Sequence, residues 1–122
     1  MCRHIPLYWR FRLLLKLRAP QKRSNYKLLH VWAQCEGGTA CFNPLNTTEP
    51  WPGATDYNSV GVKNYPSGRA GIQATYLTLV NGHYNGIVGG LRSGTAPKTI
   101  VTKYSEEFNT WGTGTTCILR SL

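Results

Sequence analysis

A helix that ends abruptly at a glutamate is the feature that most constrains this chain. Residues 24–36 have helical periodicity, and Glu36 is followed at once by two glycines. The glycine pair predicts a left-handed C-cap, so the helix should end at Glu36. Leu29, Trp32 and Glu36 are spaced by three and four residues, which places them on one face. The Glu36 carboxyl is therefore expected in line with the apolar stripe, aimed at a core or a cleft.

The position of Glu36 also affects its charge. A carboxylate at a helix C-terminus meets the negative end of the helix dipole, and partial burial beside an aromatic ring acts in the same direction. Both effects favour the protonated acid, which is the form that donates a proton in glycosidic bond cleavage. The alternative is a frayed, solvated glutamate in the last helical turn.

The remaining pattern predicts further helices and one small hairpin. Residues 8–18 alternate leucine with arginine and lysine, which predicts a short amphipathic helix. Ser24 or Asn25 is expected to cap the helix that carries Glu36. Residues 54–65 carry β-formers around a turn and predict a hairpin. Three more helical segments are predicted, at residues 66–80, 84–91 and 97–111.

An ordered series of motifs follows the Glu36 helix. Residues 42–48 read Phe-Asn-Pro-Leu-Asn-Thr-Thr, residues 66–74 read Pro-Ser-Gly-Arg-Ala-Gly-Ile-Gln-Ala, and residues 81–87 read Asn-Gly-His-Tyr-Asn-Gly-Ile. Between the first two, the predicted hairpin closes on Tyr65. This series resembles the lysozyme-like peptidoglycan hydrolases, and it is most similar to the bacterial and phage N-acetylglucosaminidases.

The resemblance implies both a fold and an activity. The implied fold is α+β and mainly α, a lysozyme-like helical domain with a small β-hairpin wing. The implied activity is hydrolysis of glycosidic bonds in the glycan strands of bacterial peptidoglycan, with Glu36 as general acid. We expect such a bacteriolytic glycosidase to be an N-acetylglucosaminidase first, with a muramidase or a lytic transglycosylase as the alternatives. Its implied setting is a bacteriophage endolysin or a virion-associated muralytic domain.

A second catalytic acid has no unambiguous position in this sequence. Asp56 on the predicted hairpin is the leading candidate, although an aspartate there also suits an ordinary turn. A carboxyl separation of about 5–5.5 Å suits a nucleophile, and about 6.5–9.5 Å suits a base that activates water. Retaining hydrolysis, inverting hydrolysis through Asp56, and a single-acid route assisted by the substrate's acetamide or 6-hydroxyl stay open. Glu49 is expected in a loop, and Glu106 and Glu107 on an exposed helix face.

Loop side chains are the candidates for glycan binding. By the resemblance, the Tyr65 hydroxyl binds an acetamido group or steadies the transition state; alternatively, Tyr65 ends the hairpin and packs on the next helix. Trp51 and Trp111 are candidates to stack on pyranose rings, whereas Trp32 is expected in the core. Amides and hydroxyls suited to sugars are found at Asn43, Asn46, Thr47 and Thr48, although these residue types also occur in plain loops.

Basic residues are concentrated at the start of the chain. Eight of the 14 Lys and Arg residues lie in the first 27 positions with no acid among them. We expect residues 1–23 to form a basic N-terminal segment with the short amphipathic helix, and residues 24–122 to form a single lysozyme-like domain. The charge favours an anionic partner such as a cell-wall polymer, lipid or nucleic acid, or else a solvated face without a partner. Nucleic acid is disfavoured because only Tyr8, Trp9 and Phe11 are interleaved with the basic cluster.

Location and cofactors follow from what the sequence lacks. No run approaches the ~18–20 apolar residues of a membrane span, so stable membrane insertion is not expected. No conventional signal peptide is visible, which predicts synthesis in the cytoplasm and action at the cell wall through phage lysis or virion delivery. The cysteine spacing implies neither a metal nor another cofactor. We expect reduced thiols, with Cys35 and Cys117 as small buried residues, or alternatively Cys35 as a catalytic thiol.

A non-catalytic protein is the rival interpretation. It is a lysozyme-like module that binds cell-wall glycan or serves in phage tail assembly. The missing second acid favours it, because a degenerate fold retains the motifs of its relatives without their full chemistry.

Overall fold

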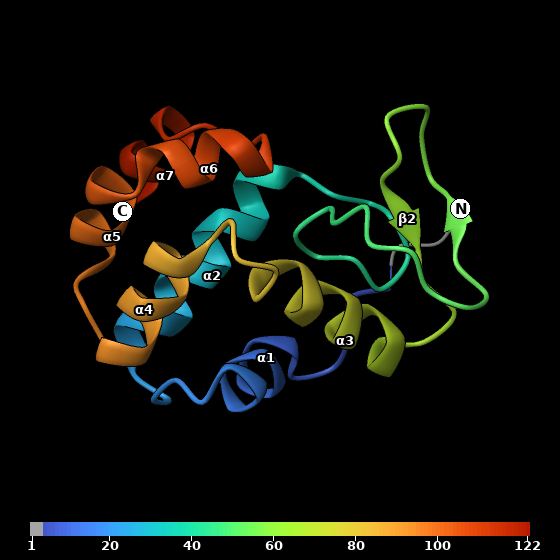
Figure 1. Ribbon diagram of the computed structural model, residues 1–122, viewed down its shortest axis with the longest axis horizontal. Coiled ribbons are helices and arrows are strands. Elements are labelled where there is room, and N and C mark those ends of the chain that lie inside the picture. The colour runs from blue at the N-terminus through green and yellow to red at the C-terminus, as the bar shows by residue number, and fades with distance from the viewer. Residues whose placement is uncertain (1–3) are drawn as a thin grey trace.

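The computed structural model describes residues 4–122, which are mainly helical with one small antiparallel sheet, as predicted. The elements of these residues are α1 (Trp9–Leu17), α2 (Arg23–Glu36), β1 (Thr55–Asp56), β2 (Lys63–Asn64), α3 (Gly68–Leu79), α4 (Asn85–Ser93), α5 (Pro97–Lys103), α6 (Ser105–Trp111) and α7 (Thr116–Ser121). Figure 1 shows α4–α7 gathered at one end of the molecule and the hairpin at the other, with α3 between them. Over the described part of the chain, no helix is long and apolar enough to cross a membrane.

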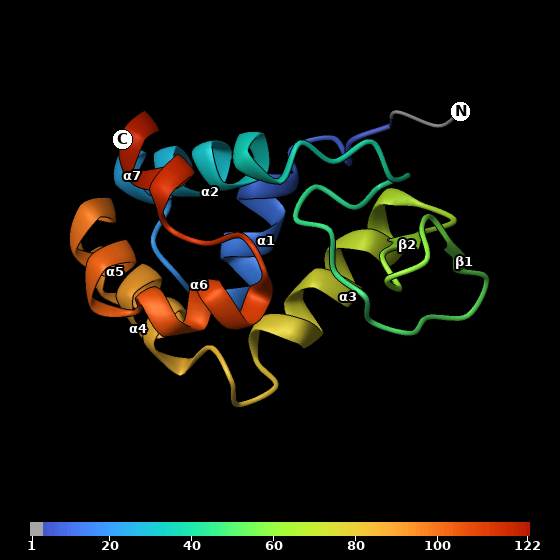
Figure 2. The same cartoon turned by 90° about the horizontal axis from the view of Figure 1, so that it is seen from above.

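One hydrophobic core joins α1 and α2 to the helices that follow. Leu13, Leu14 and Leu17 of α1 are almost fully buried, so the basic N-terminal segment contributes to the same core as the rest of the chain. Trp32 of α2 is fully buried, and the Phe108 ring packs edge-on against it at 4.9 Å between centroids. Burial of these side chains fixes α2 within the helical layer. The chain leaves the end of α2 toward the hairpin (Figure 2).

The two ends of α2 are determined differently. Gly37 has a φ of 58°, the left-handed conformation of a C-cap glycine, and the helix ends at Glu36 as predicted. The predicted N-cap is wrong, because no side chain caps the start of α2. Asn25, one of the two candidates, is buried and donates to the carbonyl oxygens of Pro20 and Leu91, both at 2.9 Å. The Asn25 side-chain amide, which the local pattern assigned to capping α2, therefore bonds to α4 instead.

The predicted single helix over residues 97–111 is also wrong. Two helices, α5 and α6, meet at Tyr104, whose φ of −113° and ψ of 34° are not helical. The break places the Tyr104 ring against Gly86 and lets the Glu107 carboxylate accept hydrogen bonds from the N–H groups of Gly86 and Ile87, at 3.0 and 2.9 Å. Glu107 thus satisfies backbone donors at the start of α4 instead of lying on a free helix face.

The predicted hairpin is confirmed, although its strands are short. Thr55 pairs with Asn64, and Asp56 pairs with Lys63. The base of the hairpin packs on α3 through a second, smaller apolar cluster, made of Tyr65, Ala70 and Ala74 with Phe42, Trp51 and Ala54. This cluster holds the hairpin beside the segment that follows Glu36.

Candidate active site

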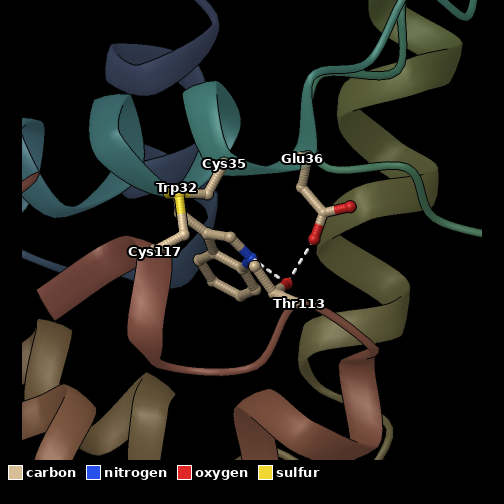
Figure 3. Close-up of a disulfide and its surroundings, with 5 residues drawn as sticks. All are labelled: Trp32, Cys35, Glu36, Thr113 and Cys117. Atoms are coloured by element: carbon tan, nitrogen blue, oxygen red, sulfur yellow. Dashed lines mark hydrogen bonds between the residues drawn. A yellow bond between two sulfur atoms is a disulfide. The ribbon is translucent and has the colours of Figure 1, made fainter. Parts of the chain in front are cut away.

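Glu36 is the last residue of α2, and both of its carboxyl oxygens accept hydrogen bonds. The Asn46 side-chain amide donates to Oε1 at 3.0 Å and to the Glu36 backbone carbonyl at 3.2 Å. The Thr113 hydroxyl donates to Oε2. Figure 3 shows the Glu36 side chain leaving the end of the helix toward Thr113. The carboxyl is thereby held from two segments that lie far apart in the sequence.

Thr113 connects Glu36 to the core. Its hydroxyl oxygen accepts a hydrogen bond from Trp32 Nε1 at 2.9 Å, while its proton goes to Glu36. An indole N–H can only donate, so Thr113 satisfies this buried donor and keeps its own proton directed at the carboxylate. Trp32 is in the core, as expected. Nothing in the sequence predicts Thr113, because a threonine between two glycines carries no pattern of its own.

A disulfide between Cys35 and Cys117 ties the end of α2 to α7. The expected reduced thiols are therefore wrong, and no cysteine in the described part of the chain is free. A sulfur held in a disulfide has no thiolate to attack with, so Cys35 is not a catalytic thiol in this state. The bond joins the residue before Glu36 to the first turn of α7, just after the loop that carries Thr113 (Figure 3).

Burial is the largest influence on the charge of Glu36, and it raises the pKa of this carboxyl above its ordinary value. The hydrogen bonds from Thr113 and Asn46 act in the opposite direction because they favour the charged form. The one ion pair within residues 4–122 lies on the hairpin, so no basic side chain neutralises Glu36 there. Glu36 is thus a fixed, half-buried acid, not the frayed and solvated glutamate of the alternative interpretation.

Gly38 makes room for Asn46 beside Glu36. A Cβ atom at residue 38 would lie 2.5 Å from Asn46 Oδ1, so a larger residue would displace the amide. Asn46 itself has a φ of 58°, a left-handed conformation that asparagine tolerates better than most residues. Among the predicted glycan-binding residues, all of which lie in the described chain, Asn46 is the one hydrogen-bonded to Glu36.

The neighbouring candidate residues of the loop form hydrogen bonds within the protein. Asn43 is buried, and its amide donates to the carbonyl oxygens of Thr47 and Lys63, both at 2.8 Å, while its Oδ1 accepts from the Thr47 N–H. Thr47 is also buried and shares a hydrogen bond with the Thr78 hydroxyl. These contacts shape the loop that presents Asn46. Thr48, in contrast, is exposed.

The aromatic candidates lie mainly at packing positions. Tyr65 is buried at the base of the hairpin, and its hydroxyl donates to the Glu49 carbonyl at 2.7 Å. Burial, helped by the Glu49 charge, raises the pKa of Tyr65. Trp51 is half-buried against the same cluster. Trp111 is also half-buried, and its Nε1 donates to the Leu45 carbonyl at 2.7 Å, which links α6 to the Asn46 loop.

Asp56 lies on β1, with a side chain that is 71% exposed and paired with Lys63 of β2. Both views place the hairpin beyond the end of α2 (Figures 1 and 2). None of the groups that hydrogen-bond Glu36 within residues 4–122 also contacts Asp56. The two acids are therefore not part of one hydrogen-bonded group.

A cleft of about 340 Å³ lies between the hairpin and the segment that follows Glu36. The hydroxyls of Thr39 and Tyr57 share a hydrogen bond there, and the Tyr57 ring is exposed. Hydroxyls, an amide and an aromatic face are groups that suit a sugar. The lining residues are Thr39, Cys41, Gly53, Thr55, Tyr57, Asn64, Tyr65 and Pro66. The sequence pattern points only to Tyr65 among them, because single polar residues in turns carry no periodic signal.

Residues 4–122 contain no group of three or more His, Cys, Asp or Glu side chains placed to hold a metal ion. No known protein family, characterised protein or solved structure matches this chain. Burial favours the protonated form of Glu36, whereas its hydrogen bonds from Asn46 and Thr113 favour the carboxylate.

Proposed function

We propose that this chain cleaves glycosidic bonds in the glycan strands of bacterial peptidoglycan, with a lysozyme-like fold and Glu36 as general acid. The observation that carries the proposal is the Glu36 carboxyl, half-buried at the end of α2 with a raised pKa and a donor on each oxygen. A carboxylic acid that holds its proton to higher pH suits protonation of a leaving oxygen. The motif series after Glu36, which resembles that of N-acetylglucosaminidases, supports this substrate class and makes N-acetylglucosaminyl bonds the first expectation.

In the proposed reaction, the Glu36 proton moves to the glycosidic oxygen as the bond from that oxygen to the anomeric carbon breaks. The electron pair of that bond stays with the leaving oxygen, and positive charge develops on the sugar ring. Glu36 becomes a carboxylate at the same moment. The Asn46 amide and the Thr113 hydroxyl already donate to its oxygens, so they stabilise the new charge without reorganising.

We favour the single-acid course over one that uses Asp56. The Asp56 carboxylate is paired with Lys63 on an exposed strand, which occupies it within the hairpin. The acetamide oxygen of the substrate then attacks the anomeric carbon to give an oxazolinium ion, which water opens while the Glu36 carboxylate takes a proton from that water. Alternatively, the 6-hydroxyl attacks the anomeric carbon, loses its proton to the Glu36 carboxylate and leaves a 1,6-anhydro end. The setting we propose is phage lysis or virion-associated cleavage of the cell wall.

A non-catalytic module that binds cell-wall glycan or serves in phage tail assembly is the second candidate function. It is favoured by the position of Asp56, which is paired with Lys63 and shares no partner with Glu36 in residues 4–122. Such a module would retain the cleft beside Tyr57 without turnover.

Incubation of purified protein with peptidoglycan, followed by mass analysis of the released fragments, tests the proposal. Glu36→Gln preserves the shape of the side chain but cannot donate a proton, and acid catalysis contributes ~10²–10⁴-fold. We therefore expect cleavage by wild type and loss of cleavage in Glu36→Gln. Glu106→Gln is the matched control, because Glu106 is exposed on α6.

The fragments also identify the bond. A reducing N-acetylglucosamine end indicates a glucosaminidase, a reducing N-acetylmuramic acid end a muramidase, and an anhydro end a lytic transglycosylase. Binding without release by wild type would favour the non-catalytic module. Activity of Glu36→Gln within a few-fold of wild type would overturn the role of Glu36.

A further inference from the structure

Exposed apolar side chains are concentrated in the segment from Ile5 to Leu15. Of the eight large hydrophobic residues exposed within residues 4–122, five lie there: Ile5, Leu7, Tyr8, Phe11 and Leu15. Phe11 and Leu15 are four residues apart on α1, so they share a face that is distinct from the buried leucines of the same helix. Leu7 and Tyr8, which are 72% and 74% exposed, adjoin the start of the helix. We call Leu7, Tyr8, Phe11 and Leu15 the outer face of α1.

Unpaired positive charge borders the outer face of α1. Arg12 and Lys16 lie on the helix, Arg18 caps it, and no acidic residue precedes Glu36 in the chain. The one ion pair within residues 4–122 joins two hairpin residues, so these cations have no carboxylate partner in the described structure. Lys16 lies over the Tyr76 ring at 5.6 Å, a contact that leaves its charge in place.

We propose that the outer face of α1 docks on an anionic lipid bilayer. In this arrangement α1 lies on the surface, with its exposed apolar side chains at the level of the acyl chains and its cations among the headgroups. Aromatic and aliphatic side chains together with flanking Lys and Arg are what binding at this interface requires. Neither Glu36 nor its hydrogen-bond partners take part, so docking is independent of the proposed cleavage.

Charge and apolar exposure together select this partner over the alternatives. A soluble polyanion, such as a wall polymer or a nucleic acid, would pair with the cations but leave Leu7 and Leu15 in water. A second copy of the chain would cover the apolar side chains but bring two sets of unpaired cations together. An anionic bilayer offers an apolar phase and negative charge at the same surface.

Co-sedimentation with lipid vesicles tests the proposal. Vesicles of phosphatidylcholine alone are compared with vesicles that also contain phosphatidylglycerol, at low and high salt. We expect wild type to bind the anionic vesicles only. Phe11→Ser/Leu15→Ser should lose about tenfold or more in affinity, and Lys16→Gln/Arg18→Gln should lose about fivefold per cation at low salt. Val60→Ser is the matched control, because Val60 is 77% exposed on the hairpin, away from α1.

Both double variants alter exposed residues, and thermal melts establish that each is folded. Failure of wild type to bind anionic vesicles overturns the proposal, even if it binds DNA or a soluble wall polymer. Equal binding by Phe11→Ser/Leu15→Ser and wild type does so as well, since charge alone then accounts for the attraction. A dimer of wild type in sedimentation that Phe11→Ser/Leu15→Ser abolishes, without vesicle binding, would assign the face to a second copy.

Discussion

Removal of the disulfide beside Glu36 should destabilise this protein more than loss of any single hydrogen bond. The double substitution Cys35→Ser/Cys117→Ser replaces both sulfurs by oxygens and removes the covalent link between α2 and α7. Those residues are 82 positions apart, so the bond closes a loop that contains most of the chain. An unfolded chain without the link gains conformational freedom, while the folded chain loses the tether next to Thr113.

The size of the effect follows from the loop length. In the chain-entropy account, a loop of 82 residues restricts the unfolded state by ~4.5 kcal/mol at 25 °C, and measured losses are usually ~2–5 kcal/mol. The free energy of unfolding of a typical domain is only ~5–15 kcal/mol. The variant should therefore lose a large share of its stability, with a fall in Tm of roughly 10–20 °C.

Urea unfolding followed by tryptophan fluorescence measures this loss, because Trp32 is fully buried in the core. Thr116→Ser is a suitable control, since Thr116 is exposed in the first turn of α7 and its substitution should change stability by about 0.5 kcal/mol or less. A loss below ~1 kcal/mol in the double variant would refute the reasoning. It would mean that Cys35 and Cys117 are not joined in solution, or that the bond hardly restricts the unfolded chain.

Two further predictions concern the contacts of Glu36. Burial raises the pKa of Glu36 in the folded protein above its value near 4.5 in the unfolded chain. The protonated side chain therefore contributes its full stabilisation below pH 4.5, and this contribution is lost as pH rises through the folded pKa. Glu36→Gln should therefore be more stable than wild type above the folded pKa, with a flatter curve of Tm against pH; parallel curves would contradict this. Thr113→Val should cost ~1–3 kcal/mol in urea unfolding, because the buried Trp32 N–H loses its acceptor. Thr113→Ser keeps the hydroxyl and should lose much less, and equal losses for the two variants would exclude the hydrogen bond as the cause.

The prediction of Glu36 shows which features can be derived from neighbouring residues alone. Apolar spacing and a glycine pair place Glu36 at a helix end on the core side, and both features depend only on residues within a few positions of it. The same reasoning predicts α1, α3, α4 and the hairpin, whose boundaries follow from glycine, proline and periodicity. It fails at Tyr104, where a contact with Gly86 breaks a helix that the spacing alone would continue.

The sequence by itself determined a mainly helical chain with a small hairpin, an acid at the end of α2, and a basic, partly apolar N-terminal segment. Only the tertiary structure decided what surrounds that acid. Thr113 is 77 residues from Glu36, and Cys117 is 82 residues from Cys35. Asn43 and Asn46 are similar in sequence context, yet one shapes the loop and the other reaches the carboxyl. Periodicity records which face of an element is apolar, but hydrogen bonds and disulfides between distant segments depend on how the packed core brings those segments together.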